Sequence, residues 1–458
     1  MMRNFNALKR VVTNMKFMMV GLLIVAISGT IYSQKVWTLK DCIEYALDNN
    51  IQIKKSELNA EMNKANFLQS KLDMLPSLNG YAQHGFNWGR TADLTTYEII
   101  TEQVQQSYFQ ISSQVDLFNG FQKYNTIKKA QSDYLASKYD SDKMRDDISL
   151  MLAQNYLNVL FSMELVEQAQ AQLDVTQLQI RNTQKLVEAG TLPKGSLLEI
   201  QSQFASEEVT LINAENRMNL AYLDLLQLLE LPATDDFKIE KPILSVGNEM
   251  NLLPTEQIYG ISVNHLPQIK SAELRFKSAE SGLAIARGAR SPRLSLSGNI
   301  NTRYSDRTFG DNPLIPFKTQ FKDNSQKGLT LQLNIPIFNG FATSTNITRA
   351  KITEKTAEYD LQLSKNTLRK AIEQAYSDAL AAYKTYNASI KSVASFQESF
   401  KYMEQKFNVG LENSLNYNVA KMQLTSAQSQ LLSNKYDYIF KSKILDFYMG
   451  NPLTLDQN

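Results

Sequence analysis

The pentapeptide Leu117-Phe-Asn-Gly-Phe121 returns 220 residues later (337 − 117) as Ile337-Phe-Asn-Gly-Phe341. Upstream of these strings the offset is 216 residues (268 − 52), and it aligns Gln52-Ile53-Lys54 with Gln268-Ile269-Lys270. Self-similarity over such a length indicates that one structural unit occurs twice in the chain. The duplication therefore decides how every other segment is interpreted.

The duplication predicts repeat units at 34–240 and 257–452, a linker at 241–256 and a C-terminal tail at 453–458. The second unit has four more residues than the first (220 − 216) between Pro292 and Phe338. Insertions collect in exposed loops, so we expect a loop there. Residues 1–33 are predicted to be a secretory signal peptide, because basic residues precede an 11-residue apolar run from Phe17 to Ile27. An uncleaved anchor helix is the alternative.

Each unit contains two segments in which apolar and polar residues alternate, the pattern of a β-strand with one apolar face. The four strands are expected at about 76–88, 107–118, 292–304 and 328–338, which is the length of a tilted membrane-spanning strand. A half-buried sheet in water alternates in the same way, so alternation alone leaves both interpretations open. In a membrane, the side chains expected to face lipid in the second unit are Leu294, Leu296, Ile300, Leu329, Leu331 and Leu333.

A long helix follows the second strand of each unit. No proline or glycine occurs between Gln122 and Glu188, and these residues would span about 100 Å as a helix. An apolar residue recurs every seventh position from Leu152 to Val187, which predicts helices packed side by side. Either a tube wall or an ordinary two-stranded coiled coil has this pattern. Shorter helices are expected at 42–73 and 196–230, each about half as long, with tip hairpins at about 189–196 and 409–414.

Four strands per chain are too few to close a membrane sheet, since the smallest closed sheets have eight strands. An open edge cannot face lipid, because each unpaired backbone group there costs several kcal/mol. If the strands lie in a membrane, the protein must therefore assemble from two, three or four copies. The strand count does not choose among these numbers.

Composition excludes several other classes of protein. Forty-eight basic and 46 acidic residues leave a net charge of +2, which does not favour a nucleic-acid partner. One cysteine, Cys42, and two histidines, His84 and His265, leave little for a metal centre or a catalytic triad. No phosphate-binding glycine loop or nucleophile elbow is present. We therefore expect neither an enzyme nor a cofactor.

Several strings resemble the TolC-type outer-membrane efflux protein family over nearly all of the mature chain. Residues 38–50 are similar to the opening helix of that family, Phe-Asn-Gly at 118–120 and 338–340 lies where strand becomes helix, and residues 87–96 resemble the first outer loop of Bacteroidetes members. The resemblance implies a homotrimer with a 12-stranded outer-membrane β-barrel on an α-helical barrel that crosses the periplasm. It also implies a passive exit duct for efflux or type I secretion, opened by a periplasmic adaptor and working with an inner-membrane transporter.

The resemblance further implies which residues act at the tip. Family adaptors contact a Val-Gly-Leu string, which is intact at Val409-Gly410-Leu411 and partly kept at Ala189-Gly190-Thr191. The aspartate pair that often narrows the family's channel is absent. The candidate residues of the constriction are Ser196, Glu199, Glu412, Asn416 and Val419.

A soluble periplasmic coiled-coil protein, structural or adaptor, is the alternative function. Adaptors usually carry one hairpin between small β-domains, whereas this chain has two hairpins and four amphipathic strands. The sequence leaves open whether the cargo is a drug, a metal ion or a polypeptide, and which pump is the partner.

Overall fold

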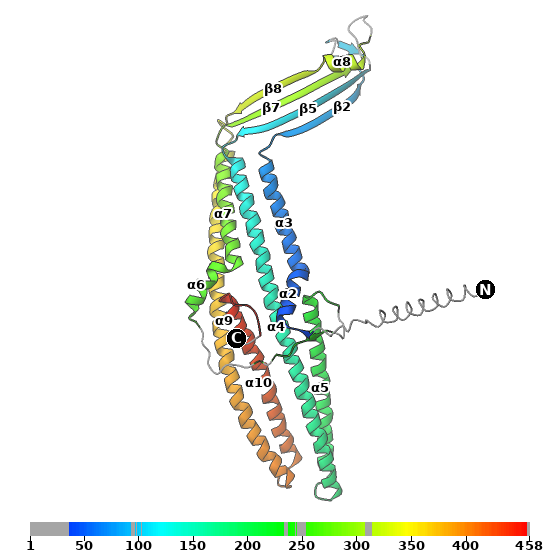
Figure 1. Ribbon diagram of the computed structural model, residues 1–458, viewed down its shortest axis with the longest axis vertical. Helices are drawn as coiled ribbons and strands as arrows, with labels where there is room; N and C mark the ends of the chain where they lie inside the picture. The colour runs from blue at the N-terminus through cyan, green and yellow to red at the C-terminus, as the bar shows by residue number, and fades with distance from the viewer. Residues whose placement is uncertain are drawn as a thin grey trace, which may run out of the picture.

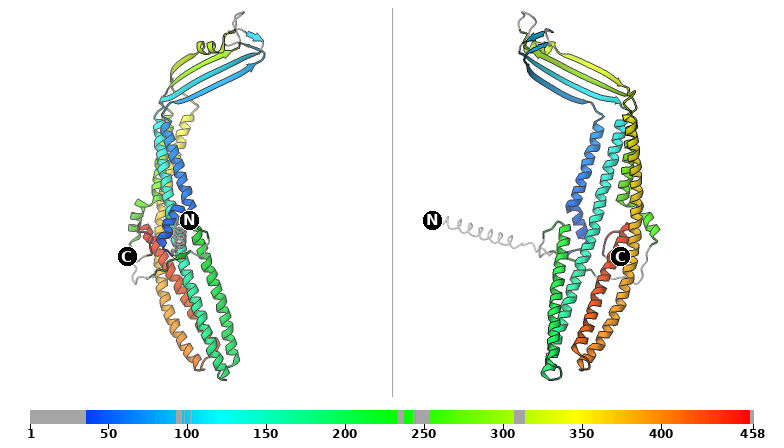
Figure 2. Two further views of the ribbon diagram at one scale, coloured as in Figure 1. Left: turned by 45° about the vertical axis from the view of Figure 1, so that its right-hand side comes forward. Right: turned by 180° about the vertical axis from the view of Figure 1, so that it is seen from behind.

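The computed structural model describes residues 36–455 except 93–96, 98, 102, 233–236, 243, 245–252 and 307–313. The predicted signal peptide and most of the predicted linker lie outside the described residues. The molecule is elongated, with a four-stranded sheet at one end and helices that run from it to two hairpin tips (Figure 1). Two further views show the sheet bent away from the helix direction (Figure 2). The prediction of a mainly helical chain with long helical hairpins is confirmed.

Both repeats contribute to one antiparallel sheet, in the order β2-β5-β7-β8. Its strands are β2 (Ser77–Asn87), β5 (Val104–Phe118), β7 (Arg293–Ser305) and β8 (Gln326–Asn334). Leu296 pairs with Val115 on one side and Leu331 on the other, so apolar side chains share one face. The last strand ends before the predicted 338, because Pro336 has no N–H to donate.

The two long helices match the predicted length and position. They are α4 (Gln122–Glu188) and α9 (Ala342–Asn408), of 67 residues each. Each begins after a left-handed pair of residues, and the glycine of each pair (Gly120, φ 66°; Gly340, φ 61°) adopts this conformation without strain. These turns explain why Phe-Asn-Gly-Phe occurs twice at the change from strand to helix.

The half-length helices complete two antiparallel hairpins. Helix α5 (Lys194–Leu228) returns along α4, and α10 (Ser414–Tyr448) returns along α9. The single helix expected at 42–73 is wrong, because α2 (Leu39–Asn49) and α3 (Ile51–Leu72) are separated at Asn50. The Asn50 side chain accepts from the N–H groups of Gln52 and Ile53 and so caps α3.

The second repeat has a similar break. Helix α6 (Thr255–His265) ends at Leu266, and α7 (Pro267–Gly288) begins with a proline. The residue before a proline avoids the helical conformation, which accounts for the break. A short helix, α8 (Phe317–Asp323), lies where the extra residues of the second unit predicted a loop.

In the described part of the chain, four short strands form two pairs outside the main sheet. At mid-height, β1 (Val36–Trp37) pairs in parallel with β6 (Lys238–Ile239). At the outer end of the sheet, β3 (Arg90–Ala92) and β4 (Ile99–Thr101) form a small hairpin. The β1–β6 pair holds the start of the described chain beside the end of the first repeat.

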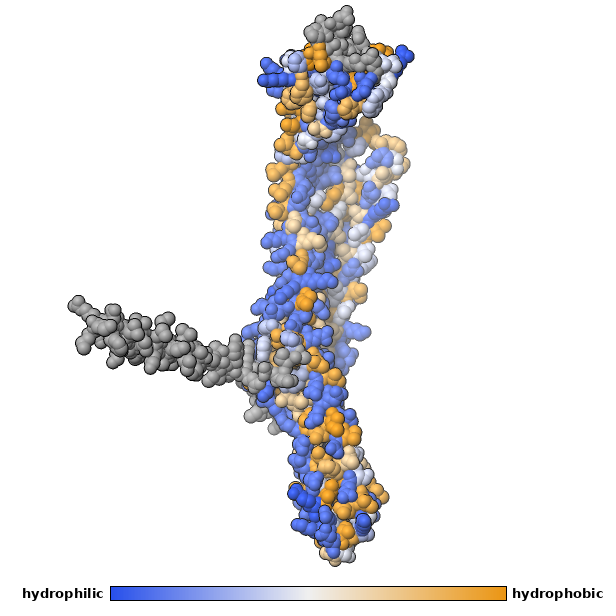
Figure 3. Space-filling view, turned by 90° about the vertical axis from the view of Figure 1, so that its right-hand side faces the viewer, coloured by the Kyte–Doolittle hydropathy of each residue, from blue (hydrophilic) through white to orange (hydrophobic). Residues whose placement is uncertain are grey.

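The apolar core lies at mid-height, where the half-length helices meet the long ones. One cluster joins α2, α4 and α5 around Cys42, Leu152 and Leu225, which are all buried. A second cluster joins α6, α7 and α9 around Ile258 and Ile372. On the face drawn in Figure 3, apolar side chains gather over the sheet end and toward the tips, and hydrophilic ones dominate between them. Within the described ranges, no helix combines the length and hydropathy that a membrane span requires.

Candidate functional site: the tips of the helical hairpins

The two hairpin tips are built in the same way. Helix α4 ends in a turn where Gly190 has φ 75° and the N–H of Thr191 donates to the carbonyl of Leu186 at 2.9 Å. Helix α9 ends identically, with Gly410 at φ 77° and the Leu411 N–H donating to Lys406 at 2.9 Å. This bond from the second residue after the cap is the Schellman termination, which favours glycine in the left-handed position.

The side chains around each glycine project into solvent. Ala189 and Thr191 are exposed at the first tip, and at the second Val409 is 70% and Leu411 78% exposed. A Cβ atom added at Gly410 would meet no atom within 4 Å. The second tip therefore presents two large apolar side chains beside open space.

Three of the five candidate constriction residues, Glu199, Glu412 and Asn416, form side-chain hydrogen bonds near the tips. Ser414 is buried and donates to the carboxylate of Glu199, which joins the start of α10 to α5. Glu412 accepts from the side chain of Asn416 at 2.8 Å, and this bond, with one from the Asn413 N–H, lowers the pKa of Glu412. The remaining candidates, Ser196 on α5 and Val419 on α10, lie on separate hairpins.

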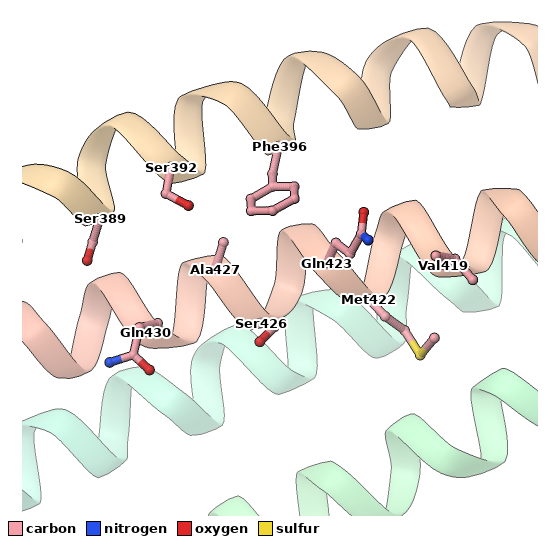
Figure 4. Close-up of a pocket in the computed structure, with 9 residues that line it drawn as sticks. All are labelled: Ser389, Ser392, Phe396, Val419, Met422, Gln423, Ser426, Ala427 and Gln430. Carbon is pink, nitrogen blue, oxygen red and sulfur yellow. The ribbon is translucent and has the colours of Figure 1, made fainter.

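Val419 lines a groove between α9 and α10, above the second tip. Ser389, Ser392 and Phe396 of α9 point toward α10, from which Gln423 and Ala427 face them (Figure 4). The volume of this groove is about 460 Å³. Its mixture of short polar and apolar side chains leaves the two helices of this hairpin incompletely packed against each other.

An aromatic cluster joins the two hairpins near the tips. The ring of Tyr417 lies 4.8 Å from that of Phe407 and 5.4 Å from that of Phe400, and Ile200 of α5 packs on the same cluster. Burial raises the pKa of Tyr417, and among the described residues its hydroxyl finds no hydrogen-bond partner. Tyr417 was not among the residues predicted from the sequence to act at the tip.

A buried polar cluster lies further from the tip, where α4, α5 and α10 meet. Lys421 Nζ is 3.1 Å from Glu207 Oε1, with side chains only 5% and 10% exposed. Lys421 also donates to Thr176, whose hydroxyl hydrogen-bonds to Glu207. Desolvation lowers the pKa of Lys421 despite the nearby carboxylate. Beside this cluster is a cavity of about 440 Å³ whose lining includes Gln172 and Gln203.

This cluster was not predicted from the sequence, although the sequence does place threonines at core-facing positions of α4. Thr176 and Thr183 occupy the small or polar positions that accompany the long heptad of α4, and both are buried. A buried hydroxyl usually has a hydrogen-bond partner, as Thr176 has in Glu207, whereas the Thr183 hydroxyl finds none among the described residues. The partner could not be identified, because Glu207 and Lys421 belong to different repeats.

Together, the sheet and the paired tips define the class of channel proteins that join long helical hairpins to a membrane β-sheet. The sequence profile of the outer membrane efflux protein family matches residues 42–230 and 260–451, and the chain belongs to this family. The chain is accordingly an outer-membrane efflux channel, and the family is one of transport channels rather than enzymes. The alternative of a soluble periplasmic coiled-coil protein is not retained.

Individual relatives agree with the family assignment. The chain is 21% identical to outer membrane protein TolC of Escherichia coli over 468 residues, covering 95% of this chain and 87% of that protein. It is 22% identical to a probable efflux pump outer membrane protein, TtgC, of Pseudomonas putida over 409 residues, or 87% and 79% of the two chains. Among solved structures, VceC of Vibrio cholerae superposes with a TM-score of 0.75 at 18% identity, covering 90% of this chain and 96% of that one.

Proposed function

We propose that three copies of this chain form a passive exit duct from the periplasm to the exterior, as the outer-membrane part of a tripartite efflux or type I secretion system. The observation that carries the proposal is a sheet at one end of a helical column about 100 Å long, whose two edge strands pair with no further strand among the described residues. The edges are β2 and β8, and the column ends in two open tips. Three copies would supply twelve strands and six hairpins.

The apolar face of the sheet supports its contact with outer-membrane lipid. Leu329, Leu331 and Leu333 of β8 are 78%, 62% and 58% exposed in one copy. Ile300 is 47% exposed, and Leu294 and Leu296 are half-buried on the same face. The opposite face carries serine, asparagine and glutamine side chains that suit a water-filled interior.

The internal repeat supports a specific helical interface between copies. Arg145 of α4 pairs with Glu57 of α3 at 2.5 Å, and the equivalent residues in the second repeat, Lys365 and Glu273, are 3.9 Å apart. Each long helix therefore contacts the upper helix of its own repeat in the same way. Helix α4 additionally packs against α7 of the second repeat, whereas α3 and α9 lie at opposite sides of the layer (Figure 1).

The contact equivalent to α4–α7 would place α9 of one copy against α3 of the next. Within a copy, Asp140 of α4 accepts from Ser271 and Arg275 of α7, both at 2.6 Å. The residues at the same offsets are Asp360 (140 + 220) and Lys55 (271 − 216). Their opposite charges fit a contact between copies, and apolar side chains on both surfaces would be covered: Leu58, Met62, Ile352, Tyr359 and Leu363.

The tips would receive a periplasmic adaptor that connects the duct to an inner-membrane transporter. Val409, Gly410 and Leu411 form the main docking tip, with Ala189, Gly190 and Thr191 as the lesser one. The constriction would be lined by Ser196, Glu199, Glu412, Asn416 and Val419. Because Glu199 bonds Ser414 across the two hairpins, widening of the tip would separate this pair.

Replacing Gly410 with tryptophan tests the docking role. The side chain has room in the isolated tip, and the left-handed backbone costs a non-glycine residue only about 1–2 kcal/mol. We therefore expect the outer-membrane trimer to form but export to be lost, measured as cargo retained in cells. Gly410→Asn is the control, because asparagine tolerates a left-handed backbone and adds little bulk. Normal export in Gly410→Trp would contradict docking at this tip, and loss of the trimer would indicate a folding defect.

A further inference from the structure

Helix α8 occupies an unexpected position at the outer end of the sheet. It lies on the apolar face, because Thr302 and Tyr304 alternate in register with Leu296 and Ile300, and both contact α8. The Thr302 hydroxyl donates to the carbonyl of Phe321 at 2.7 Å. Connections at the end of a sheet need not fold back over a face. This one places α8 at the outer end of the sheet, beside β7 and β8 (Figure 1).

Hydrogen bonds hold α8 in this place. Gln320 is buried, and it accepts from the N–H of Ser305 at 3.1 Å and donates to the carbonyl of Ser305 at 2.8 Å. Asn324, one turn later, donates to the carbonyl of Arg303 at 2.9 Å. The helix therefore contacts the sheet through the side that carries Gln320 and Asn324. This contact sets the orientation of its other sides.

An aromatic stripe lies beside the docked side. The ring of Phe317 is 5.2 Å from that of Tyr304, and the ring of Phe321 is 5.5 Å from that of Phe109. Contact with the sheet is incomplete, since Phe317 and Phe321 remain 48% and 43% exposed. The preceding residues extend the same surface, with Leu314 51% and Ile315 46% exposed.

A basic stripe adjoins the aromatic one. Lys318 and Lys322 are exposed, one turn apart, on the side of the helix opposite Gln320. Lys327 of β8 pairs with Ile300 and so lies on the same face of the sheet. Residues 314–327 contain three lysines and a single acidic residue, Asp323, which leaves the segment basic.

We propose that residues 314–327 bind phosphate groups of anionic lipid at the outer surface of the membrane. Phe317 and Phe321 enter the acyl-chain boundary, and Lys318 and Lys322 contact the headgroups. A short amphipathic helix with aromatic and basic stripes side by side has the composition of an element lying in a membrane interface. Its apolar stripe continues the lipid-facing surface of the sheet, which selects a lipid surface over free phosphate. The inference rests on the proposed membrane location of that sheet.

Lipid selectivity of the purified full chain tests the proposal. The chain in uncharged detergent is mixed with equal amounts of phosphatidylglycerol and phosphatidylcholine, and retained lipid is measured by native mass spectrometry. We expect preferential retention of phosphatidylglycerol, and a roughly ten-fold lower preference in Lys318→Gln/Lys322→Gln. The matched control, Lys384→Gln/Lys391→Gln, removes two exposed lysines from α9 and should keep the preference. An unchanged preference in the first variant would overturn the proposal.

Two further measurements distinguish lipid contact from the binding of free phosphate. Phe321→Trp should be quenched by brominated acyl chains beyond the level of the parent chain, and no added quenching would place α8 away from the lipid. Displacement of phosphatidylglycerol by millimolar inorganic phosphate would assign the site to free phosphate instead. Failure of the parent chain to insert into vesicles would reject the proposed function and this inference together, whereas insertion without lysine-dependent selectivity would reject only the inference.

Discussion

The Lys421–Glu207 pair is an unusual feature at the scale of single residues. Two charged side chains are buried between three helices, and hydrogen bonds from Thr176, Gln172 and Gln203 surround the carboxylate. Removing charges from water is expensive, so such a pair adds little stability over apolar residues of the same size. We expect the pair to favour one position of α10 against α4 and α5.

Removing one member of the pair should cost far more than removing both. Lys421→Met leaves Glu207 buried without a counter-charge, and we expect a loss of about 3–5 kcal/mol in the free energy of unfolding. Lys421→Met/Glu207→Met should recover most of that loss. Unfolding in detergent measures both, with Lys384→Met as a surface control. Equal destabilisation by the single and double variants would contradict the account.

Residues differ in how far the sequence predicts them. The glycines at the tips could be predicted, because Gly190 and Gly410 follow long glycine-free segments and only a left-handed turn lets the chain reverse there. The partner of Lys421 could not, because the pair depends on how two hairpins from different repeats pack. Local sequence determines backbone conformation more directly than it determines contacts between distant segments.

At the scale of elements, the change from strand to helix shows where the two repeats differ. A Cβ atom at Gly120 would lie 2.3 Å from the carbonyl oxygen of Gly288, and one at Gly288 would lie 2.4 Å from that of Gly120. Two backbones therefore touch at this junction. The equivalent Gly340 meets no atom within 4 Å in one copy, and the residue equivalent to Gly288 is Leu72 (288 − 216).

Alanine at these two glycines should have different effects. Gly120→Ala forces two backbones apart, and we expect almost no folded protein in the membrane fraction. In Gly340→Ala the added methyl group meets no neighbouring atom of the same copy. The expected loss of stability is therefore only that of an alanine in the left-handed conformation, about 1–2 kcal/mol. Immunoblots of membrane fractions and thermal unfolding compare them. Equal loss in both variants would mean that a neighbouring copy crowds Gly340 as closely as Gly288 crowds Gly120.

Elements were predicted well where the pattern was long and poorly where it was short. The segment from Gln122 to about Glu188, without proline or glycine, predicted the extent of α4, and the duplication predicted an equivalent helix at the position of α9. The break at Asn50 was not predicted, because asparagine is tolerated inside helices. The side-chain amide that caps α3 is held by a hydrogen bond from Asn50 Nδ2 to the carbonyl of Leu228 at 2.9 Å, and this distant contact cannot be read from the local sequence. The seven-residue α8 was expected as a loop, since its position depends on contacts with β7.

At the scale of the whole molecule, the two faces of the sheet should respond oppositely to charge. Leu331→Arg puts a charge on the lipid-facing side, where it costs about 2–4 kcal/mol near the membrane midplane, so we expect poor assembly. Gln332→Arg, on the adjacent residue, places the same charge on the polar side and should be tolerated. Membrane fractionation and native gels measure both. Equal tolerance would contradict contact between this face and lipid.

A single copy contains three of the four helix contacts that the repeat leads us to expect, and the fourth requires a neighbour. A disulfide between Lys55→Cys and Asp360→Cys on adjacent copies probes that fourth contact. Cys42 is buried, and each single variant serves as a control. We expect covalent species of up to three chains after mild oxidation of the outer-membrane protein. Recovery of single chains only, from a double variant that folds and reaches the membrane, would contradict it.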